Sequence, residues 1–262
     1  MALRNVVCIK QVPDTTEVRM DPVKGTLIRE GVKSIVNPFD SYAVEEGVRL
    51  REKHGGTVTV VTMGPPQAES ALREAISLGC DEAVLVSDRK FAGSDTWATS
   101  YTLSCAIRKL GDFDVILCGK QASDGDTAQV GPGISTHLDI PQVTYVKKIE
   151  EITDGKAKVE RMTEEGYDII ETPLPCLLTV VKEINSPRLP SLKGMMRAKS
   201  AQIIKWTASD VDCDPKSIGL DGSPTRVVKI FTPAPRKGGE MIKGDTAQVA
   251  QEIVQLLKDI VI

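Results

Sequence analysis

Residues 115–132 carry the pattern of an anion-binding loop between a strand and a helix. The apolar run Val115–Cys118 predicts a strand that is buried on both faces, and Gly119 permits a sharp turn where that strand ends. Asp126 and Gln129 have the spacing of a capping box, which predicts a helix that starts near Thr127. In a parallel sheet, such a helix N-terminus offers free amide donors to a phosphate. An ordinary strand–loop–helix connection would show the same local features.

One hexapeptide of this loop occurs twice in the chain. Residues 125–130 and 244–249 both read Gly-Asp-Thr-Ala-Gln-Val. No strand pattern precedes the second copy, so there the hexapeptide predicts only a favourable helix start. A capping box alone is therefore no sign of a ligand. What distinguishes the first copy is the strand and Gly119 before it and Gly131-Pro132 after it.

Other catalytic signatures are missing from the sequence. It contains no Gly-x-Gly-x-x-Gly after a strand, no Walker loop, no His-Glu-x-x-His and no nucleophile elbow. The six cysteines form no Cys-x-x-Cys pair, so buried free thiols are expected. His54 and His137 have no second metal ligand nearby in the sequence, so no metal site is predicted. The sequence therefore favours a binding function over a self-contained catalytic site.

Bulk properties narrow the class of protein. A chain of 262 residues holds one large α/β domain, or a smaller one with an appendage. The formal net charge of -3 argues against nucleic acid as a partner. The first apolar run is too short for a signal peptide and no apolar segment reaches 18 residues, so we expect a cytoplasmic protein without membrane insertion.

The elements that must position the loop alternate along the first half of the chain. Apolar runs predict buried strands, and amphipathic stretches between them predict helices, which together indicate βαβ units and a parallel sheet. The strands are expected at 5–10, 58–62, 83–86 and 115–118, and the helices at about 40–54, 68–78, 96–110 and 127–138. A hairpin pattern at 18–29 forms an excursion before the first helix.

After the loop the pattern changes to successive strands with polar turns. These strands are expected at 143–149, 156–162, 167–170 and 177–181, so the sheet should finish in antiparallel hairpins. The fold class is thus α/β, a parallel sheet flanked by helices with antiparallel strands added. Beyond residue 205, an extended C-terminal arm ends in an amphipathic helix at about 246–260, which needs a surface to pack on. We predict an α/β domain over 1–205 and an arm over 206–262.

Residues 182–205 contain six basic side chains and one acidic one, within an acidic chain. Pro187 and Pro190 disfavour a helix in the first part, and the remainder has the character of an exposed loop. The apolar residues of the segment are Leu189, Leu192, Met195 and Met196. They either fold inward beneath a solvated basic face or form a docking surface with an apolar anchor and a basic rim.

The carboxyl ends of the predicted parallel strands bring polar segments to one edge of the sheet, where an adenine nucleotide would fit. Those segments are Lys10 to Asp14, Asn37 to Phe39, Thr62 to Pro65 and Gly119 to Val130. Lys10 could pair with a phosphate or be solvated. Asp14 and Asp124 could accept hydrogen bonds from a ribose or shape turns.

Three motifs give the chain a resemblance to the β subunit of electron-transfer flavoproteins. The segment 119–131 is similar to the nucleotide-binding loop of that family. The segments 159–166 and 175–179 resemble its signature, although Asp168 stands where that signature usually has Glu or Gln. The segment 185–199 is similar to the recognition loop that docks acyl-CoA dehydrogenases.

The resemblance implies an adenine-nucleotide α-hydrolase-like, Rossmann-type fold and a choice between two nucleotides. One branch of the family holds structural AMP, and another holds an FAD that accepts hydride from NADH and bifurcates electrons. Ala128 and Val130 stand where AMP-type members tend to carry Asn and Thr, and Gly125 where they carry an acid, so the loop looks like the FAD type. The pyrophosphate would then lie on the amides of Thr127 to Val130.

By this resemblance, the cofactor-binding residues come from the strand ends and the loop. They are Ile9, Lys10, Asp14, Asn37, Thr62, Met63, Gly64, Cys118, Gly119, Gln121, Asp124, Gly125, Asp126, Thr127, Ala128, Gln129 and Val130. The docking residues are Leu189, Leu192, Met195, Met196, Arg197 and Lys199, with Leu192 as the anchor.

The implied partners are an α subunit carrying a second FAD, an acyl-CoA dehydrogenase, and ferredoxin or flavodoxin. The alternatives are a non-bifurcating subunit that holds AMP and an adenine-nucleotide-binding regulatory module without electron transfer.

Overall fold

The computed structural model describes residues 2–14, 19–20, 27–28, 34–228, 238–239 and 241–258. The chain divides into two compact units, Met1–Val228 and Lys229–Ile262. The division falls later in the chain than the boundary expected after Lys205. The first unit contains the sheet and every candidate site residue.

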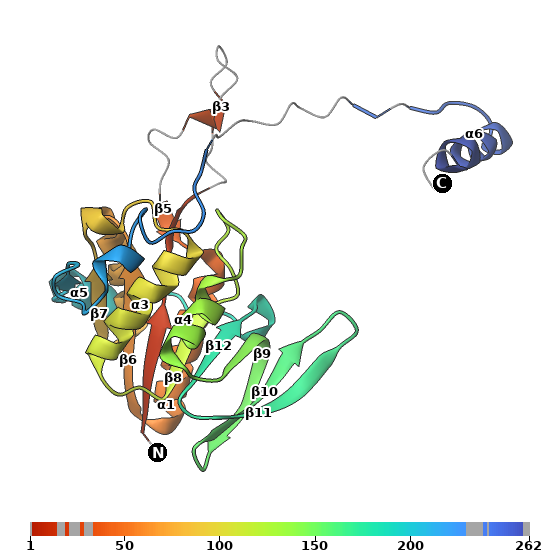
Figure 1. Cartoon of the computed structure of the whole chain (residues 1–262). Coiled ribbons are helices and arrows are strands. Elements are labelled where there is room, and N and C mark those ends of the chain that lie inside the picture. Colours follow the sequence, from red (N-terminus) through yellow and green to blue (C-terminus); the bar gives the residue numbers. More distant parts are fainter. Residues whose placement is uncertain are drawn as a thin grey trace. The chain divides into compact units, whose positions relative to one another are not determined.

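The first unit is built on a sheet that has nine strands among the described residues, in the order β11-β10-β9-β12-β8-β1-β6-β7-β13 (Figure 1). The seven strands β9, β12, β8, β1, β6, β7 and β13 are parallel to their neighbours within this set. The pairs β9–β10 and β10–β11 are antiparallel. The predicted α/β fold with added antiparallel strands is therefore confirmed. The strands are β1 (Leu3–Cys8), β6 (Gly56–Met63), β7 (Glu82–Val86), β8 (Val115–Gly119), β9 (Gln142–Thr153), β10 (Lys156–Met162), β11 (Tyr167–Pro173), β12 (Cys176–Val180) and β13 (Ile204–Trp206).

The position of β12 corrects one expectation. The strand predicted at 177–181 does not extend the antiparallel hairpins but enters the centre of the sheet, parallel to both β8 and β9. All five of its residues are buried, because helices cover both faces of the sheet at this position. A strand that is apolar on both faces belongs in the interior of a parallel sheet.

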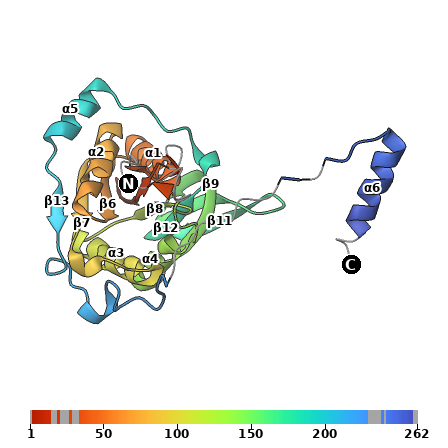
Figure 2. The same ribbon diagram turned by 90° about the horizontal axis from the view of Figure 1, so that it is seen from above.

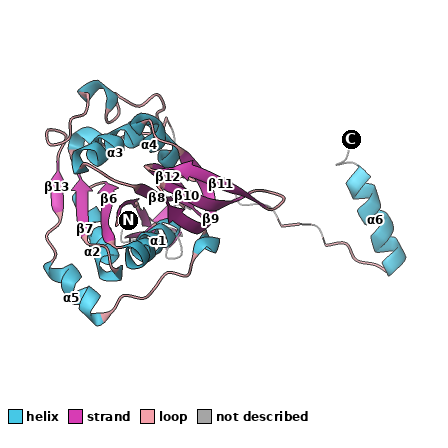
Figure 3. Ribbon diagram, turned by 90° about the horizontal axis from the view of Figure 1, so that it is seen from below, coloured by secondary structure: helices cyan, strands magenta, loops and turns pink. Residues whose placement is uncertain are grey.

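Helices form one layer on each face of the sheet (Figures 2 and 3). One layer contains α1 (Pro38–His54) and α2 (Glu69–Leu78), with α5 (Leu192–Ser200) packed on α2. The other contains α3 (Thr96–Leu110) and α4 (Val130–Leu138). Alternate residues of the strands point to the two layers: Val7 and Val60 belong to the first core, and Val6 and Val61 to the second.

Short elements connect these layers. β2 (Gln11–Pro13) pairs antiparallel with β5 (Ser34–Val36), and β3 (Arg19–Met20) pairs antiparallel with β4 (Leu27–Ile28). The second pair confirms the excursion before α1, although residues 21–26 at its turn lie outside the described residues. The 3-10 turns are η2 (Pro66–Ala68), η3 (Arg89–Phe91), η4 (Lys182–Ile184) and η5 (Pro215–Ser217).

The segment 182–205 is more regular than the sequence suggested. No α-helix includes Pro187 or Pro190, as expected, and α5 begins directly after them, where the Ser191 side chain accepts a hydrogen bond of 3.0 Å from the Gly194 amide. The segment ends in β13, whose residues pair with β7. The expectation of an exposed loop is therefore wrong for 192–200 and 204–206.

In the second unit, α6 (Thr246–Lys258) confirms the helix predicted at 246–260 as far as residue 258, where the described part of the unit ends. None of the helices in the described ranges has the length and apolar character needed to cross a bilayer.

Candidate functional site

The predicted strand-end residues meet at one edge of the sheet because β6, β1 and β8 are adjacent and parallel. Lys10 lies two residues beyond β1, Met63 and Gly119 end β6 and β8, and Gly64 follows β6. The Thr62 hydroxyl donates a hydrogen bond of 2.7 Å to the Ile9 carbonyl, which ties two of the strand ends together. Gly64 is held by a 3.1 Å hydrogen bond from its amide to the Val86 carbonyl. Asp14 follows β2, beyond the end of β1.

Beneath this edge, Asp40 joins the start of α1 to two strand ends. Its carboxylate accepts hydrogen bonds from the amides of Lys10 at 2.7 Å and Gly119 at 3.1 Å. Burial raises the pKa of Asp40 to about 7, against the opposing effect of hydrogen bonds from Lys10, Asn37 and Gly119. Asp40 is not among the residues predicted for the site, although an acid in the first turn after an Asn-Pro helix start is a usable signal.

Asn37 fastens the loop after β8 to the same place. Its amide nitrogen Nδ2 donates to the Gln121 carbonyl at 2.8 Å, and its Oδ1 accepts from the Ser123 amide at 3.0 Å. Its own backbone amide donates to the Lys10 carbonyl at 2.8 Å. A buried side chain with all of these bonds fixes the loop against the end of β1.

Lys10 and Asp124 form an ion pair across the edge, with 2.6 Å between Nζ and Oδ1. The Lys10 side chain is about half exposed (49%), so its ammonium can also face a ligand. The structure thus brings together two residues that the sequence placed on different strand ends. The pair sets one cation beside the loop that leads to α4.

The loop itself corrects the predicted helix start. α4 begins at Val130 and not near Thr127, because Asp126 and Ala128 have φ angles of 56° and 54°, in the left-handed region. Asp126 caps none of the amides in the described ranges. Its carboxylate accepts a hydrogen bond from the Gln121 side chain, and the Gln129 Oε1 accepts one from the Thr96 hydroxyl at 2.9 Å.

The second copy of the hexapeptide does form the predicted capping box. Asp245 Oδ1 accepts from the amides of Ala247 and Gln248 at 3.0 Å each. The Gln248 side chain accepts from the Asp245 amide at 3.3 Å in return. One hexapeptide therefore adopts two conformations, a helix start at 244–249 and an irregular loop at 125–130.

The irregular conformation leaves backbone donors free. Within the described chain, the amides of Thr127, Ala128, Gln129 and Val130 donate to no protein acceptor. Successive amides around a left-handed residue form a concavity that binds anions, and the N-terminus of α4 adds its positive dipole end. Gly131 lets α4 approach β12, since a Cβ there would lie 2.8 Å from Thr179 Cγ2. The arrangement can hold a phosphate or pyrophosphate group.

Residues 185–199, which we call the docking segment, present their apolar side chains to solvent. Leu189, Leu192 and Met196 are each more than 70% exposed, and Met195 is 40% exposed. The alternative in which these side chains fold inward is therefore wrong. The sequence did not predict the bonds of Arg188 and Arg197 that anchor the docking segment on the neighbouring helices.

Those anchors lie at both ends of the segment. The Arg188 guanidinium donates to Glu45 at 2.8 Å and to Glu52 at 2.6 Å. Although burial opposes the effect, hydrogen bonds from Arg188 and Arg49 lower the pKa of Glu45. Arg197, which the sequence placed in the docking rim, donates to the carbonyls of Ile76 and Cys80 and so holds α5 on α2. Lys199 is exposed.

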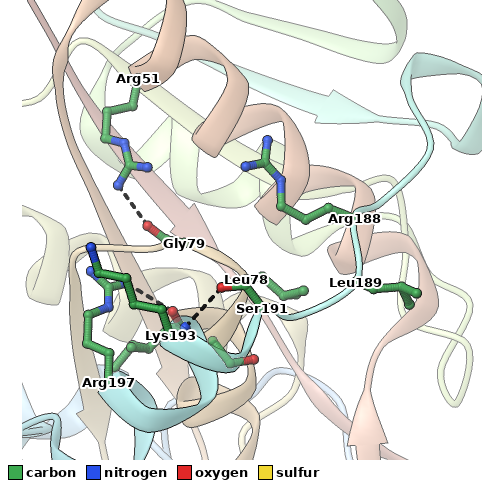
Figure 4. Close-up of a pocket in the computed structure, with 11 residues that line it drawn as sticks. Arg51, Leu78, Gly79, Arg188, Leu189, Ser191, Lys193 and Arg197 are labelled. Atoms are coloured by element: carbon green, nitrogen blue, oxygen red, sulfur yellow. Dashed lines mark hydrogen bonds between the residues drawn. The ribbon is translucent and has the colours of Figure 1, made fainter.

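A cavity of about 290 Å³ lies beneath the docking segment and away from the strand ends (Figure 4). Arg51, Arg188, Lys193 and Arg197 line it, and Arg51 Nη1 donates to the Gly79 carbonyl at 2.7 Å. Three of these cations also bond to protein acceptors, so the cavity is chiefly a seam between α5 and the helices below it. No group of three or more His, Cys, Asp or Glu residues among those described could hold a metal ion.

One family model and several known proteins match most of this chain. The family model described as the electron transfer flavoprotein domain matches residues 24–211. The electron transfer flavoprotein subunit beta of Thermoanaerobacterium thermosaccharolyticum is 55% identical over 253 residues, covering 96% of each chain. The caffeyl-CoA reductase-Etf complex subunit CarD of Acetobacterium woodii is 51% identical over 259 residues, covering 98% of each. Protein FixA of Azotobacter vinelandii is 50% identical over 249 residues, covering 92% of this chain and 88% of that protein.

Proposed function

Because this chain belongs to the family of electron transfer flavoprotein β subunits, we propose that its strand-end site binds FAD and that it pairs with an α subunit that carries a second FAD. The observation that carries this proposal is the row of four amides at Thr127 to Val130 that have no acceptor among the residues the structure describes. The pyrophosphate of FAD has the charge and the oxygen acceptors that these donors require.

The residues around the loop fit the same ligand. Lys10 supplies a cation next to the amides, and its pairing with Asp124 keeps it at the loop. Asn37 and Asp40 bind no ligand in this proposal; they hold the loop and the two strand ends in position. Gly119 allows the chain to pass close to Asp40, since a Cβ there would lie 2.4 Å from the carboxylate oxygen.

Held by the amides of Thr127 to Val130 and by Lys10, FAD would supply the redox chemistry of this proposal, which is hydride acceptance from NADH and electron transfer to the α-subunit FAD and to ferredoxin or flavodoxin. The chain supplies binding, orientation and tuning of the potential. In this proposal, the amides of 127–130 donate hydrogen bonds to the pyrophosphate oxygens, and the cation of Lys10 adds to the positive potential at the edge.

We propose an acyl-CoA dehydrogenase as the partner that receives electrons from the α-subunit FAD. The exposed residues Leu189, Leu192 and Met196 form an apolar surface of the kind that a partner covers. Their anchors, Arg188 and Arg197, fix the backbone of the segment, which lowers the entropy cost of docking. A relative at 51% identity is named as part of a caffeyl-CoA reductase complex, which supports a partner that acts on CoA thioesters.

AMP is the alternative ligand, because the same amides could donate hydrogen bonds to a single phosphate. The loop residues Ala128 and Val130 favour FAD over AMP on the resemblance of the loop to the bifurcating branch. A regulatory module without electron transfer is disfavoured by membership of a flavoprotein family.

Cofactor extraction from the purified heterodimer tests the proposal. Two FAD per heterodimer are expected, and NADH should bleach flavin absorbance under anaerobic conditions. One FAD with one AMP would replace the proposal by the AMP alternative. Two FAD that NADH does not bleach would refute the hydride-accepting role while leaving the FAD site intact.

A further inference from the structure

The two copies of the hexapeptide differ in what their glutamine side chains bind. In the second copy, the Gln248 Oε1 accepts a hydrogen bond of 3.3 Å from the Asp245 amide, which closes the capping box. In the first copy, the Oε1 of the corresponding Gln129 accepts a hydrogen bond of 2.9 Å from the Thr96 hydroxyl instead. Because the six residues are identical in the two copies, their conformations must be set by residues outside the hexapeptide.

Thr96 is the first residue of α3, and the packing of this helix fixes its position. Asp95 caps α3 by accepting hydrogen bonds from two of its first amides at 2.9 and 3.1 Å. α4 packs closely on α3, since a Cβ on Gly133 would lie 2.5 Å from the Ser100 hydroxyl oxygen. The contact between the two helices therefore brings the residue before α4 to Thr96.

Asp126, the other capping residue of the first copy, is also bound elsewhere. Its carboxylate accepts a hydrogen bond from the Gln121 side chain, and its amide donates to the Ala122 carbonyl at 2.8 Å. Gln121 and Ala122 belong to the same loop as Asp126, whereas Thr96 belongs to a helix that precedes β8 in the chain. Of these partners, Thr96 is the one that connects the hexapeptide to a regular element outside the loop.

The irregular conformation of the first copy has a cost that its hydrogen bonds must offset. Ala128 has a φ of 54°, and this left-handed conformation is disfavoured for an alanine by about 5- to 30-fold. The loss of the N-cap disfavours the conformation by about a further fivefold. A single hydrogen bond shifts an equilibrium by about 3- to 10-fold in the opposite direction. Loss of the bond between Thr96 and Gln129 is therefore large enough to change which conformation the loop adopts.

We propose that Thr96 is a positioning residue of the nucleotide site, whose hydroxyl keeps Gln129 out of a capping box and so keeps the amides of 127–130 available to the ligand. Thr96 touches no ligand in this proposal and acts through Gln129. The ligand group is a phosphate or pyrophosphate. Its assignment to FAD rests on the proposed function, whereas the effect of Thr96 on the loop does not.

The second copy shows what the loop becomes without this bond. There the amides of 247–249 all donate to Asp245, two to its Oδ1 and one to its carbonyl oxygen, at 3.0 Å each. In the first copy, the equivalent conformation would direct the amides of 128–130 to Asp126. Three of the four free donors would then no longer be available to an anion.

Hydrogen exchange resolved to single amides tests this role in the full-length chain with its copurifying α subunit, after bound nucleotide has been removed. Thr96→Val keeps the shape of the side chain and removes the hydroxyl. We expect exchange at the amides of 128–130 to become about 3- to 10-fold slower, because these amides then bond to Asp126. A substitution that only loosened the fold would make exchange faster, so slower exchange is specific to the proposed rearrangement.

Two variants serve as controls. Thr96→Ser keeps the hydroxyl and should exchange like the wild type. Thr225→Val removes a threonine hydroxyl that donates to Asp95, the neighbour of Thr96, at 2.8 Å, and it should leave exchange at 128–130 unchanged. Titration of the nucleotide-free proteins with FAD should show an affinity about 3- to 10-fold weaker for Thr96→Val and a wild-type affinity for both controls.

The proposal is overturned if exchange at 128–130 is unchanged or faster in Thr96→Val, or if it slows while the affinity for FAD stays at the wild-type value. Thr96→Ala removes the same hydroxyl and decides the question if the valine variant does not fold. If exchange slows as expected but the wild type binds no FAD, the proposed cofactor is wrong and the effect of Thr96 on the loop stands.

Discussion

The carboxylate of Asp40 accepts a hydrogen bond from the Gly119 amide at 3.1 Å, and this contact joins the first turn of α1 to the end of β8. The two residues are so close that an ideal Cβ on Gly119 would lie 2.4 Å from Asp40 Oδ1 and 2.6 Å from the backbone carbon of Phe39. Only glycine permits this approach, so the edge of the sheet that carries the candidate site depends on the absence of a side chain at residue 119.

We therefore expect Gly119→Ala to destabilise the protein by about 1 to 3 kcal/mol, the usual cost of forcing an extra methyl group into a packed site. Chemical denaturation measures this change. Gly125→Ala is the matched control in the same loop, because a Cβ at Gly125 meets nothing within 4 Å. Equal stability losses in the two variants would contradict the packing argument.

Asp40 should also give the stability of the protein a pH dependence of known sign. Its pKa is about 7 in the folded state, against an ordinary value of 3.8. Between these two pH values, Asp40 is therefore protonated in the folded chain and ionised in the unfolded chain. The contribution of this group to stability is therefore complete below about pH 4 and is lost as the pH rises towards 7.

The variant Asp40→Asn cannot titrate, and its amide group must face one of the two backbone donors that the carboxylate now accepts. It should be less stable than the wild type by about 1 to 3 kcal/mol at pH 5, with a difference that narrows towards pH 8. Urea denaturation from pH 5 to 8 measures the stability difference and its change with pH. The exposed Asp112→Asn serves as the control, and a difference for Asp40→Asn that stays constant with pH would exclude the titration.

The same substitution should affect hydrogen exchange in one copy of the hexapeptide and not in the other. Asp245→Ala removes an acceptor of two amides and should speed hydrogen exchange at Ala247 and Gln248 about fivefold, the equivalent of a lost cap of about 1 kcal/mol. Asp126→Ala should leave exchange at the start of α4 unchanged, since Asp126 caps no amide of that helix. Faster exchange in α4 would show that the helix starts as the sequence suggested.

These copies also show what the sequence could and could not predict. Strands such as β8 and helices such as α3 follow from local features: α3 begins and ends at the predicted residues because Asp95 caps it and Gly111 follows it. The conformation of 125–130 is set by partners distant in sequence, such as Thr96 on Gln129, and local capping rules contain no information about them. For Asp40, the local pattern indicates only an acid at a helix start, whereas its bonds to Lys10 and Gly119 depend on two strand ends that only the fold brings to it.

The docking proposal predicts a functional effect without a structural one. Leu192 is 78% exposed, so Leu192→Ala should leave stability and bound flavin unchanged. It should lower kcat/KM for the acyl-CoA dehydrogenase by about 10- to 100-fold, the usual effect of truncating an apolar anchor. Ile169→Ala, at an exposed position of β11, is the control. Flavin loss in Leu192→Ala would disprove the docking role.

Ala128 provides the sharpest test of the nucleotide site, because the second copy of the hexapeptide supplies a control with the same neighbours in sequence. At 128 the residue has φ 54°, a left-handed conformation that costs a non-glycine residue about 1 to 2 kcal/mol and that a β-branched residue adopts least readily. Ala128→Val should therefore pull the loop out of this conformation and disperse the amides of 127–130. Ala247→Val changes the same residue in the second copy of the hexapeptide, where the alanine lies in helix α6 and has no left-handed conformation to lose.

The measurement is the FAD content of the heterodimer, with the unfolding midpoint recorded for both variants. Ala128→Val should reduce two FAD per heterodimer to one, because the proposal assigns the second FAD to the α subunit, and Ala247→Val should retain two. Ala128→Gly, which adopts the left-handed conformation freely, should also retain two. If Ala128→Val binds two FAD as tightly as the wild type, the pyrophosphate does not lie on these amides.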